Sequence, residues 1–191
     1  PMMKLRLAQP SVLIDIGRLS DLSYIRDAGD HIAIGAMTRH MDVETSDVLK
    51  EHVPLLAHAA GHVGDPQVRH RGTIGGSVAN NDPAADYPSA LVALDATVHT
   101  SGRKIAAEAF FTGMFATALK SDEIVTAVEF KVPKKAGYAK FPNPASLYAM
   151  VGVFVAQMAD GSARVAVTGA GSAVFRVPEM EAALAKKFAA S

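Results

Sequence analysis

Short apolar runs alternate with polar, turn-forming segments along all 191 residues of this chain. β-branched runs at residues 12–16 and 32–34 predict two strands, and residues 19–25 between them predict a turn with a short helix. Residues 54–63 have helical spacing with proline at the first position, so their Leu and Ala side chains are expected to pack inward. Thr38 is a candidate for the start of an intervening helix. The pattern therefore predicts strands that alternate with short helices.

The second half of the chain predicts more strands than helices. Strands are expected at residues 98–100, 103–105, 124–132, 149–158 and 163–169, and helices at residues 88–94 and 178–188. Ser101-Gly102 and Asp160-Gly161 supply turn residues between neighbouring strands, which is typical of hairpins. Phe110 and Phe111 lead into a predicted loop that ends at Leu119.

A polar break divides the chain. Proline, two lysines and a glycine gather at residues 133–137, between two strand-like stretches. We therefore expect a first unit over residues 1–135 and a second unit over residues 138–191. The second unit would hold two apolar strands followed by an amphipathic helix.

Charge and composition exclude several classes of protein. The formal net charge is zero, with no run of Lys or Arg longer than a pair, which argues against nucleic-acid binding and against a membrane-surface patch. No apolar stretch reaches the roughly 20 residues that a membrane span needs, and no positively charged start followed by an apolar run suggests secretion. With 49% apolar residues, a sizeable core is expected. We expect a soluble, cytoplasmic protein.

The chain contains no cysteine. This excludes disulfides, thiolate catalysis and the ligation of an iron–sulfur cluster by this chain's own cysteines. The serines stand in predicted turns without a Gly-x-Ser-x-Gly pattern, so hydrolysis by a serine nucleophile has no support.

The segment from residue 65 to residue 88, DPQVRHRGTIGGSVANNDPAADYP, gathers glycines, hydroxyls, amides and aspartates in a stretch too short to build a core. Glycine lets another molecule approach the main chain, so the N–H groups of residues 73–77 are expected to converge on an anion. Asn80 and Asn81 could read the polar edge of a heterocycle. The spacing matches neither a P-loop nor a dinucleotide fingerprint. By spacing alone, a cofactor cradle and a glycine-rich turn both remain open.

The motif RGTIGGS at residues 71–77, with GDPQVR before it and DPAAD after it, resembles the second flavin-binding loop of the FAD subunit of molybdenum hydroxylases. That family includes the medium subunit of aerobic carbon monoxide dehydrogenases and the flavin domain of xanthine dehydrogenase. Further similar stretches, in the same order, are residues 1–10, 32–40, 110–119, 122–130 and 148–155. The resemblance thus covers almost the whole chain.

The resemblance implies an α+β fold of the PCMH-type FAD-binding kind. Residues 1–135 would form the second subdomain, a mixed or antiparallel sheet with flanking helices. Residues 138–191 would form the start of a small α+β C-terminal domain. In the family, a first glycine-rich loop that takes the FAD pyrophosphate precedes the equivalent of residue 1, so the chain as written is expected to bind FAD weakly or not at all.

The resemblance also implies the residues that contact FAD. The loop residues are Thr73, Ile74, Gly75, Gly76 and Ser77, and the acid beside the flavin's ribityl chain or ring is Asp86. Val63 would lie against the cofactor, and Ile124 and Val125 would lie on the face of the ring. Lys140 would approach the ring near N1, where a cation stabilises the anionic reduced flavin.

Each of these residues also has a structural alternative. Asp86 could simply cap the helix predicted at residues 88–94, and Lys140 could be a solvated surface lysine. Val63, Ile124 and Val125 could be ordinary core residues. His58 and His62 are four residues apart on a predicted helix, a spacing that can hold a metal, but no third ligand is evident in the sequence.

The family resemblance implies an electron relay. Electrons would leave substrate at a molybdopterin centre in a large subunit, pass two [2Fe-2S] clusters in a small subunit, reach FAD in this chain and go to an external acceptor. The assembly would be a heterotrimer or a dimer of heterotrimers. A scaffold paralogue or fragment that docks partners without flavin is an alternative, and so is a stand-alone flavin oxidase. The substrate is not encoded in this chain.

Overall fold

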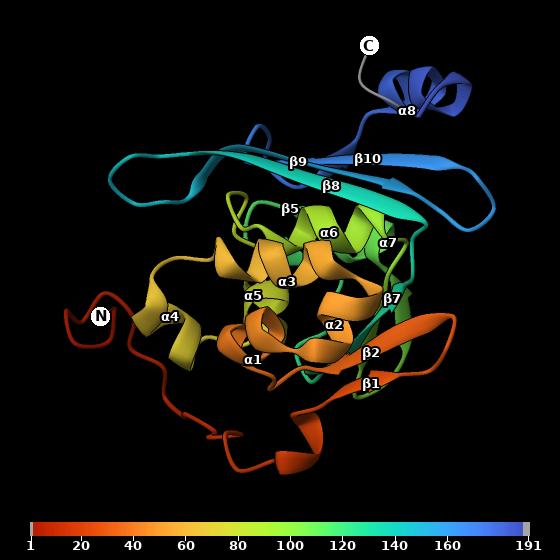
Figure 1. Ribbon diagram of the computed structural model, residues 1–191. Helices are drawn as coiled ribbons and strands as arrows, with labels where there is room; N and C mark the ends of the chain where they lie inside the picture. The colour runs from red at the N-terminus through yellow and green to blue at the C-terminus, as the bar shows by residue number, and fades with distance from the viewer. Residues whose placement is uncertain (1, 189–191) are drawn as a thin grey trace.

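A computed structural model describes residues 2–188 and shows two larger antiparallel sheets with a layer of short helices between them, and a separate two-stranded hairpin (Figure 1). The first half contains η1 (Ser20–Leu22), β1 (Ile25–Asp27), β2 (His31–Gly35), α1 (His40–Thr45), α2 (Asp47–His52), α3 (Pro54–Gly61), α4 (Pro66–Arg71), α5 (Ile74–Asn80) and α6 (Tyr87–Ala93). The second half contains β3 (Thr97–Thr100), β4 (Lys104–Ala106), α7 (Ala107–Phe110), β5 (Phe111–Gly113), β6 (Ala116–Thr117), β7 (Val125–Lys131), β8 (Lys135–Pro142), β9 (Ala149–Gln157), β10 (Ala163–Thr168), β11 (Phe175–Arg176) and α8 (Pro178–Lys186).

The larger sheet has the strand order β1-β2-β7-β3-β4, and each neighbouring pair is antiparallel. Residues two apart along a strand point to the same face, so Ile32 and Ile34 of β2 lie beside Phe130 and Val128 of β7 in one buried row. Val98 of β3 is opposite Val128 and extends that row. This face covers the helical layer.

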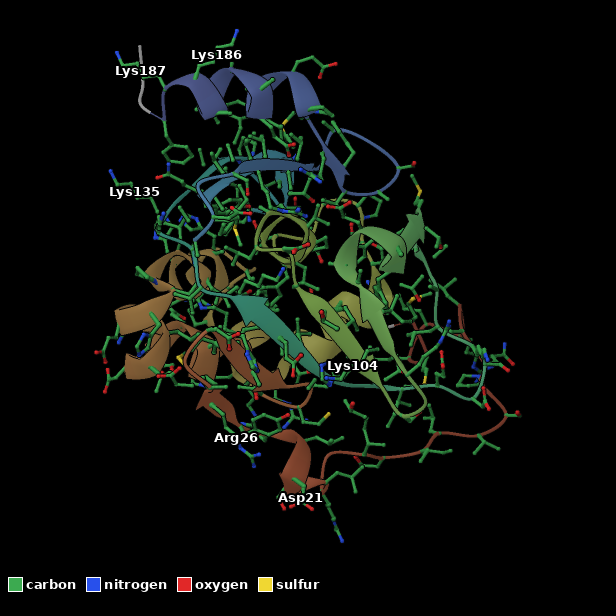
Figure 2. The ribbon with its side chains drawn as sticks, turned by 90° about the vertical axis from the view of Figure 1, so that its right-hand side faces the viewer. Asp21, Arg26, Lys104, Lys135, Lys186 and Lys187 are labelled. Atoms are coloured by element: carbon green, nitrogen blue, oxygen red, sulfur yellow. The ribbon has the colours of Figure 1, made fainter. Side chains whose placement is uncertain are left out.

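The second sheet has the order β11-β10-β9-β8, again antiparallel, and lies across the helical layer on its other side (Figure 1). Helix α6 is buried along its whole length and contacts β9 and β10. Phe154 and Ala166 of these strands share one hydrophobic cluster with α6 and with the inner face of the larger sheet. Charged side chains such as Lys135, Lys186 and Lys187 point away from the body (Figure 2).

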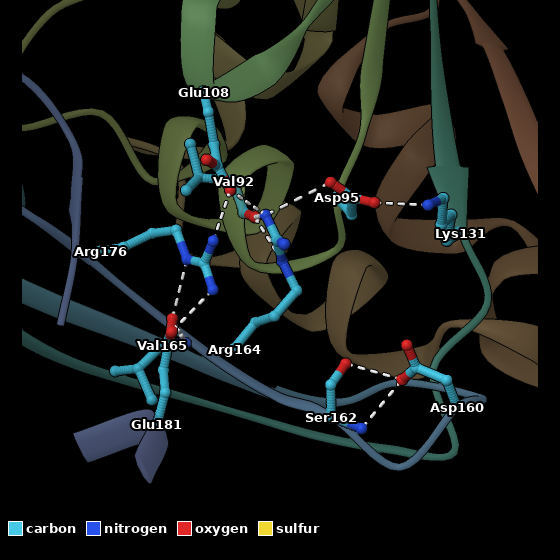
Figure 3. A network of polar contacts seen from close by, with 10 residues as sticks. All are labelled: Val92, Asp95, Glu108, Lys131, Asp160, Ser162, Arg164, Val165, Arg176 and Glu181. Carbon is cyan, nitrogen blue, oxygen red and sulfur yellow. Dashed lines mark hydrogen bonds and ion pairs between the residues drawn. The ribbon is translucent and has the colours of Figure 1, made fainter. Parts of the chain in front are cut away.

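An ion-pair network holds the second sheet and α8 to the region of α6 and α7 (Figure 3). Arg164 of β10 donates to the Val92 carbonyl at 2.8 Å and pairs with Glu108 and Asp95. Arg176 of β11 pairs with Glu108 at 2.8 Å and with Glu181 of α8 at 2.6 Å. Because both arginines are largely or partly shielded from water, these pairs are stronger than isolated surface pairs.

Most predicted elements are confirmed. They are the strands at 32–34, 124–132, 149–158 and 163–169, the hairpin around Ser101-Gly102, the short helical turn within 19–25, and the helices at 54–63, 88–94 and 178–188. In the part that the structure describes, no helix has the length and apolarity needed to cross a membrane.

Three local predictions were wrong. Residues 12–16 form no strand, and Val12, Leu13 and Ile14 are exposed, because β-branched residues make a strand only where a neighbouring strand is available. Thr38 does not start α1: its hydroxyl donates to the Tyr24 carbonyl and accepts from the Tyr24 N–H, and Arg39 precedes the helix. The expected loop at 110–119 contains the small β5–β6 hairpin instead.

Candidate functional site

Helices α4 and α5 and the segment after α3 meet strand β8 around a cavity of about 640 Å³. Its walls come from residues 63–65, the α4–α5 region, the turn at 82–86, and β8 with the loop that follows it. The lining residues are Met37, His40, Val63, Gly64, Asp65, Val68, Arg71, Gly72, Thr73, Gly76, Ser77, Asn80, Asp82, Ala85, Asp86, Lys140, Ala145, Ser146, Leu147 and Tyr148. Six residues that the family resemblance implied for the cofactor are among them: Val63, Thr73, Gly76, Ser77, Asp86 and Lys140.

A second cleft, of about 480 Å³, lies between the larger sheet and the β9–β10 turn. Its wall includes Asp95, Lys131 and Arg164, which are already paired with one another. The first cavity is therefore the better candidate for a ligand, since it combines apolar walls with a few convergent polar groups.

The glycine-rich motif forms the beginning of α5. Thr73 is its N-cap residue, and the threonine Oγ1 accepts a hydrogen bond from the Gly76 N–H at 3.2 Å. Ile74 is fully buried in the core. A Cβ added to Gly75 would collide with Ala36, lying 2.7 Å from its carbonyl oxygen and 2.8 Å from its Cα. The first glycine of the pair thus lets α5 approach the segment after β2.

Gly76 faces the opposite way, toward the cavity. Among the described residues, a Cβ added there would have one neighbouring heavy atom within 4 Å, the Thr73 Oγ1 at 3.0 Å. The two adjacent glycines therefore have different reasons to be glycine. Gly75 makes room for the protein's own backbone, and Gly76 leaves room in the cavity.

The prediction that the N–H groups of residues 73–77 converge on an anion was wrong for most of the run. The Ile74 N–H donates to the Thr38 carbonyl at 3.0 Å, and the Gly75 N–H donates to the Ala36 carbonyl at 2.9 Å. The Gly76 and Ser77 N–H groups donate to the side chain and the carbonyl of Thr73. What this segment presents to the cavity is hydroxyl groups and an open glycine face.

The most unusual feature of the wall is a buried charged pair. The Lys140 Nζ lies 3.0 Å from the Asp86 carboxylate and donates a second hydrogen bond, at 2.8 Å, to the His62 carbonyl. The Tyr138 hydroxyl also donates to Asp86. The side chains of Lys140 and Asp86 are 3% and 5% exposed, so the alternative of a solvated surface lysine was wrong.

Asp86 does not cap α6 through its side chain, although it precedes that helix. Its carboxylate is instead hydrogen-bonded to Tyr138 and Lys140. Burial raises the pKa of the Asp86 carboxyl, while the Tyr138 hydrogen bond and the Lys140 ammonium act in the opposite direction. Shielding a charged pair from water costs desolvation free energy, so its presence in the cavity wall points to a role in binding.

The other residues predicted for the cofactor are divided between the core, the surface and the cavity wall. Val125 is buried in the core at the start of β7, and Ile124 is half exposed beside Ser101, to which its N–H donates. Asn80 lines the cavity, but the Asn81 amide instead donates to the Gly113 and Ala116 carbonyls and holds the β5–β6 hairpin.

Among the described residues, His58 on α3 and His62 directly after it contact each other and no third ligand. The Nε2 atoms of His58 and His62 are 3.1 Å apart. Within residues 2–188, no group of three or more His, Cys, Asp or Glu side chains is arranged to hold a metal.

Sequence reasoning missed three contributions to the site. Tyr138 stands behind Asp86, His40 lines the wall beside Gly72, and residues 145–148 close one side. The strand spacing of Tyr138 and Lys140, two residues apart, could have indicated that both point to the same face. Nothing in the local sequence marks His40 or the loop.

His40 makes stability depend on pH. It is buried, its Nδ1 lies 3.2 Å from the Tyr87 hydroxyl, and burial, helped by the Arg69 charge, lowers its pKa to about 4. The unfolded chain, with its ordinary pKa of about 6.5, takes up the proton first as the pH falls. This group therefore costs no stability above about pH 6.5, and between about pH 6.5 and about pH 4 it removes up to about 3 kcal/mol of the free energy of unfolding.

Urea denaturation of the unaltered protein and of His40→Gln at several pH values measures this effect. The difference in free energy of unfolding between the two proteins should change across that window and stay constant above it. A constant difference at all pH values would contradict the buried, neutral imidazole.

Comparison with known proteins identifies the family. Residues 1–135 match the family described as "FAD binding domain in molybdopterin dehydrogenase". The chain belongs to this family. It is 39% identical to the glyceraldehyde dehydrogenase medium chain of Sulfolobus acidocaldarius, over 95% of this chain and 68% of that protein. It is 38% identical to the carbon monoxide dehydrogenase medium chain of Hydrogenophaga pseudoflava, over 92% of this chain and 65% of that protein. This member thus spans about two thirds of the length of these relatives.

Solved structures agree with the predicted α+β fold. Carbon monoxide dehydrogenase from Hydrogenophaga pseudoflava superposes with a TM-score of 0.89 at 36% identity, covering 96% of this chain and 68% of that one. Quinoline 2-oxidoreductase from Pseudomonas putida 86 gives a TM-score of 0.85 at 29% identity, covering 92% of this chain and 65% of that one. The predicted resemblance and the PCMH-type fold class are confirmed, and this family member is an oxidoreductase subunit of the molybdenum hydroxylase type.

The family's cofactor, FAD, fits the cavity on chemical grounds. Hydroxyls of Thr73 and Ser77 and the Asn80 amide offer hydrogen bonds to polar groups, and the bare face of Gly76 allows close approach. Asp86 offers carboxylate oxygens to hydroxyl donors, and Val63 adds apolar wall.

Proposed function

We propose that this chain holds FAD in the cavity between α5 and β8 and serves as the electron-transfer module of a molybdenum hydroxylase. The observation that carries the proposal is the joint presence, in one cavity, of the open Gly76 face and the buried Asp86–Lys140 pair. A catalytic acid or base is not needed from this chain, because FAD itself supplies the redox chemistry.

The proposal gives each wall residue a separate task. Thr73, Gly76, Ser77 and Asn80 form the polar side on which the cofactor rests. Asp86 accepts hydrogen bonds from its hydroxyl groups. The Lys140 ammonium offsets the Asp86 charge, so that this wall does not repel a reduced, anionic flavin.

Four other residues predicted to contact FAD lie outside the cavity wall. Ile74 and Gly75 support the site by seating α5 against the core. Ile124 lies just before β7 and Val125 begins it, and neither lines the cavity. Their contact with the flavin ring stays a prediction.

The proposed partners follow from the relatives and from composition. The relatives are described as medium chains or as subunits of complexes, and this chain has no cysteine to hold an iron–sulfur cluster. We infer a large molybdopterin subunit and a small [2Fe-2S] subunit, in a cytoplasmic heterotrimer or dimer of heterotrimers that passes electrons through FAD to an external acceptor.

Titration with FAD tests the function. Because the chain as written is expected to bind FAD weakly, its visible spectrum is recorded before and after an excess of FAD is added. Protein-bound oxidised flavin should appear only in the excess, and fluorescence titration should give a saturable but weak Kd. The same titration after addition of separately purified partner subunits asks whether assembly strengthens binding. A protein that assembles with such partners but stays colourless at saturating FAD would favour the scaffold alternative and contradict the relay.

A further inference from the structure

Tyr138 stands directly behind the cavity wall. It lies on β8 two residues before Lys140, and its hydroxyl donates to the Asp86 Oδ1. Its ring packs against Phe154 at 5.8 Å and meets the edge of His62 at 6.2 Å between ring centroids. The tyrosine therefore reaches the cavity only through the carboxylate that it holds.

The second sheet leaves space for the Tyr138 hydroxyl. Along β8, residues 136, 138 and 140 are shielded while residues 135, 137 and 139 are exposed, so Tyr138 and Lys140 point together toward Asp86 and His62. Gly152 of β9 is the partner of Lys140 in the ladder. A Cβ added to Gly152 would lie 2.8 Å from the Tyr138 hydroxyl oxygen, so a glycine at this position leaves the space that the hydroxyl occupies.

The hydroxyl changes what Asp86 can do. The Lys140 ammonium lies 3.0 Å from both carboxylate oxygens, so without Tyr138 the lysine would be the principal donor to this buried carboxylate. A second donor stabilises the ionised form and fixes the plane of the carboxylate, leaving its remaining lone pairs directed into the cavity.

We propose that Tyr138 is a positioning residue of the cofactor site, holding Asp86 ionised and oriented so that the carboxylate accepts hydrogen bonds from hydroxyl groups of the bound cofactor. This assignment rests on the proposed function, and it adds a residue that does not itself line the cavity. Tyr138 acts through Asp86 and takes no part in electron transfer.

The charges around Asp86 define the pH response. Tyr138 and Lys140 face it from β8, and His62 faces it from the end of α3. Other titratable or charged groups in the same cavity wall are His40, Asp65, Arg71, Asp82 and Tyr148. All of these remain when only the tyrosine hydroxyl is removed, so a change in pH response in that variant belongs to the hydroxyl.

Tyr138→Phe is the variant that tests the assignment, with Tyr24→Phe as matched control. Tyr24 lies on the segment before β1, with its ring beneath the Arg26 guanidinium, and is absent from the cavity wall. Loss of a hydrogen bond to a buried carboxylate should raise the Kd for FAD about tenfold. Because the carboxyl pKa rises when its donor is lost, the fall in affinity on acidification should begin at a higher pH in Tyr138→Phe than in the unaltered protein.

A readout without cofactor separates positioning from general damage. The ¹³C resonance of the Asp86 carboxyl, assigned with Asp86→Asn, gives its pKa in the FAD-free protein, and this pKa should be higher in Tyr138→Phe and unchanged in Tyr24→Phe. Merely structural damage would lower affinity equally at all pH values.

Three outcomes would overturn the assignment. Equal affinities and equal acid limbs in the unaltered protein and Tyr138→Phe would refute it while leaving the proposed function intact. An unchanged carboxyl pKa would also refute it. Absence of FAD binding by the unaltered protein, alone and with partner subunits, would remove both the proposed function and this inference.

Discussion

Replacing Gly76 with valine is expected to abolish FAD binding while the protein stays folded. The valine side chain would project from α5 into the cavity, where only the Thr73 hydroxyl lies close to the new Cβ among the described residues. That hydroxyl can shift slightly, and valine is no worse than glycine inside a helix, so the free energy of unfolding should change by less than about 1 kcal/mol. The Kd for FAD should rise at least about 100-fold, since the added carbons occupy the cofactor's space.

Gly137→Val is the matched control for this variant. Gly137 lies on the exposed side of β8, an added Cβ there meets nothing within 4 Å among the described residues, and valine suits a strand. Fluorescence titration gives the affinity of each variant, and circular dichroism during urea denaturation gives its stability. FAD binding by Gly76→Val with an unchanged Kd would refute the assignment of this cavity.

The neighbouring substitution, Gly75→Ala, is expected to damage the fold itself. A single methyl group at this position would overlap Ala36, including the backbone carbonyl that accepts the Gly75 N–H. Because backbone atoms cannot move aside as a flexible side chain can, α5 would have to lift from the segment after β2. We expect the free energy of unfolding to fall by at least about 3 kcal/mol.

Gly76→Ala is the internal control for that experiment, because it adds the same methyl group one residue further along the same helix. Urea denaturation of both variants should show a large loss of stability for Gly75→Ala and a loss of less than about 1 kcal/mol for Gly76→Ala. Equal stabilities would show that α5 does not approach Ala36 as closely as the structure has it.

Local chemistry made much of the fold predictable. Pro54 at the first helical position and the Ser101-Gly102 turn are signals contained in a few consecutive residues, and the corresponding helix and hairpin are where the sequence places them. The β-branched run at residues 12–16 has an equally clear local signal and forms no strand. A strand also needs a partner for its hydrogen bonds, and local sequence does not supply that information.

The glycine-rich motif and the family resemblance located the candidate site in the sequence before its geometry was known. They could not distinguish Gly75 from Gly76, because the roles of the two glycines depend on which side of α5 meets Ala36 and which side meets the cavity. They also could not show that Lys140 is buried.

The sequence by itself determined most of the elements, although not β8, together with the family and many residue types of the cavity wall. Only the tertiary structure decided that Lys140 and Tyr138 meet Asp86, across separations of 54 and 52 residues, and that Ile124 and Val125 lie away from that cavity. The physical reason is that helices and turns arise from interactions between near neighbours in the chain. A contact between distant residues depends instead on how the sheets and helices pack against one another, since packing sets both the distance between two charges and the water around them.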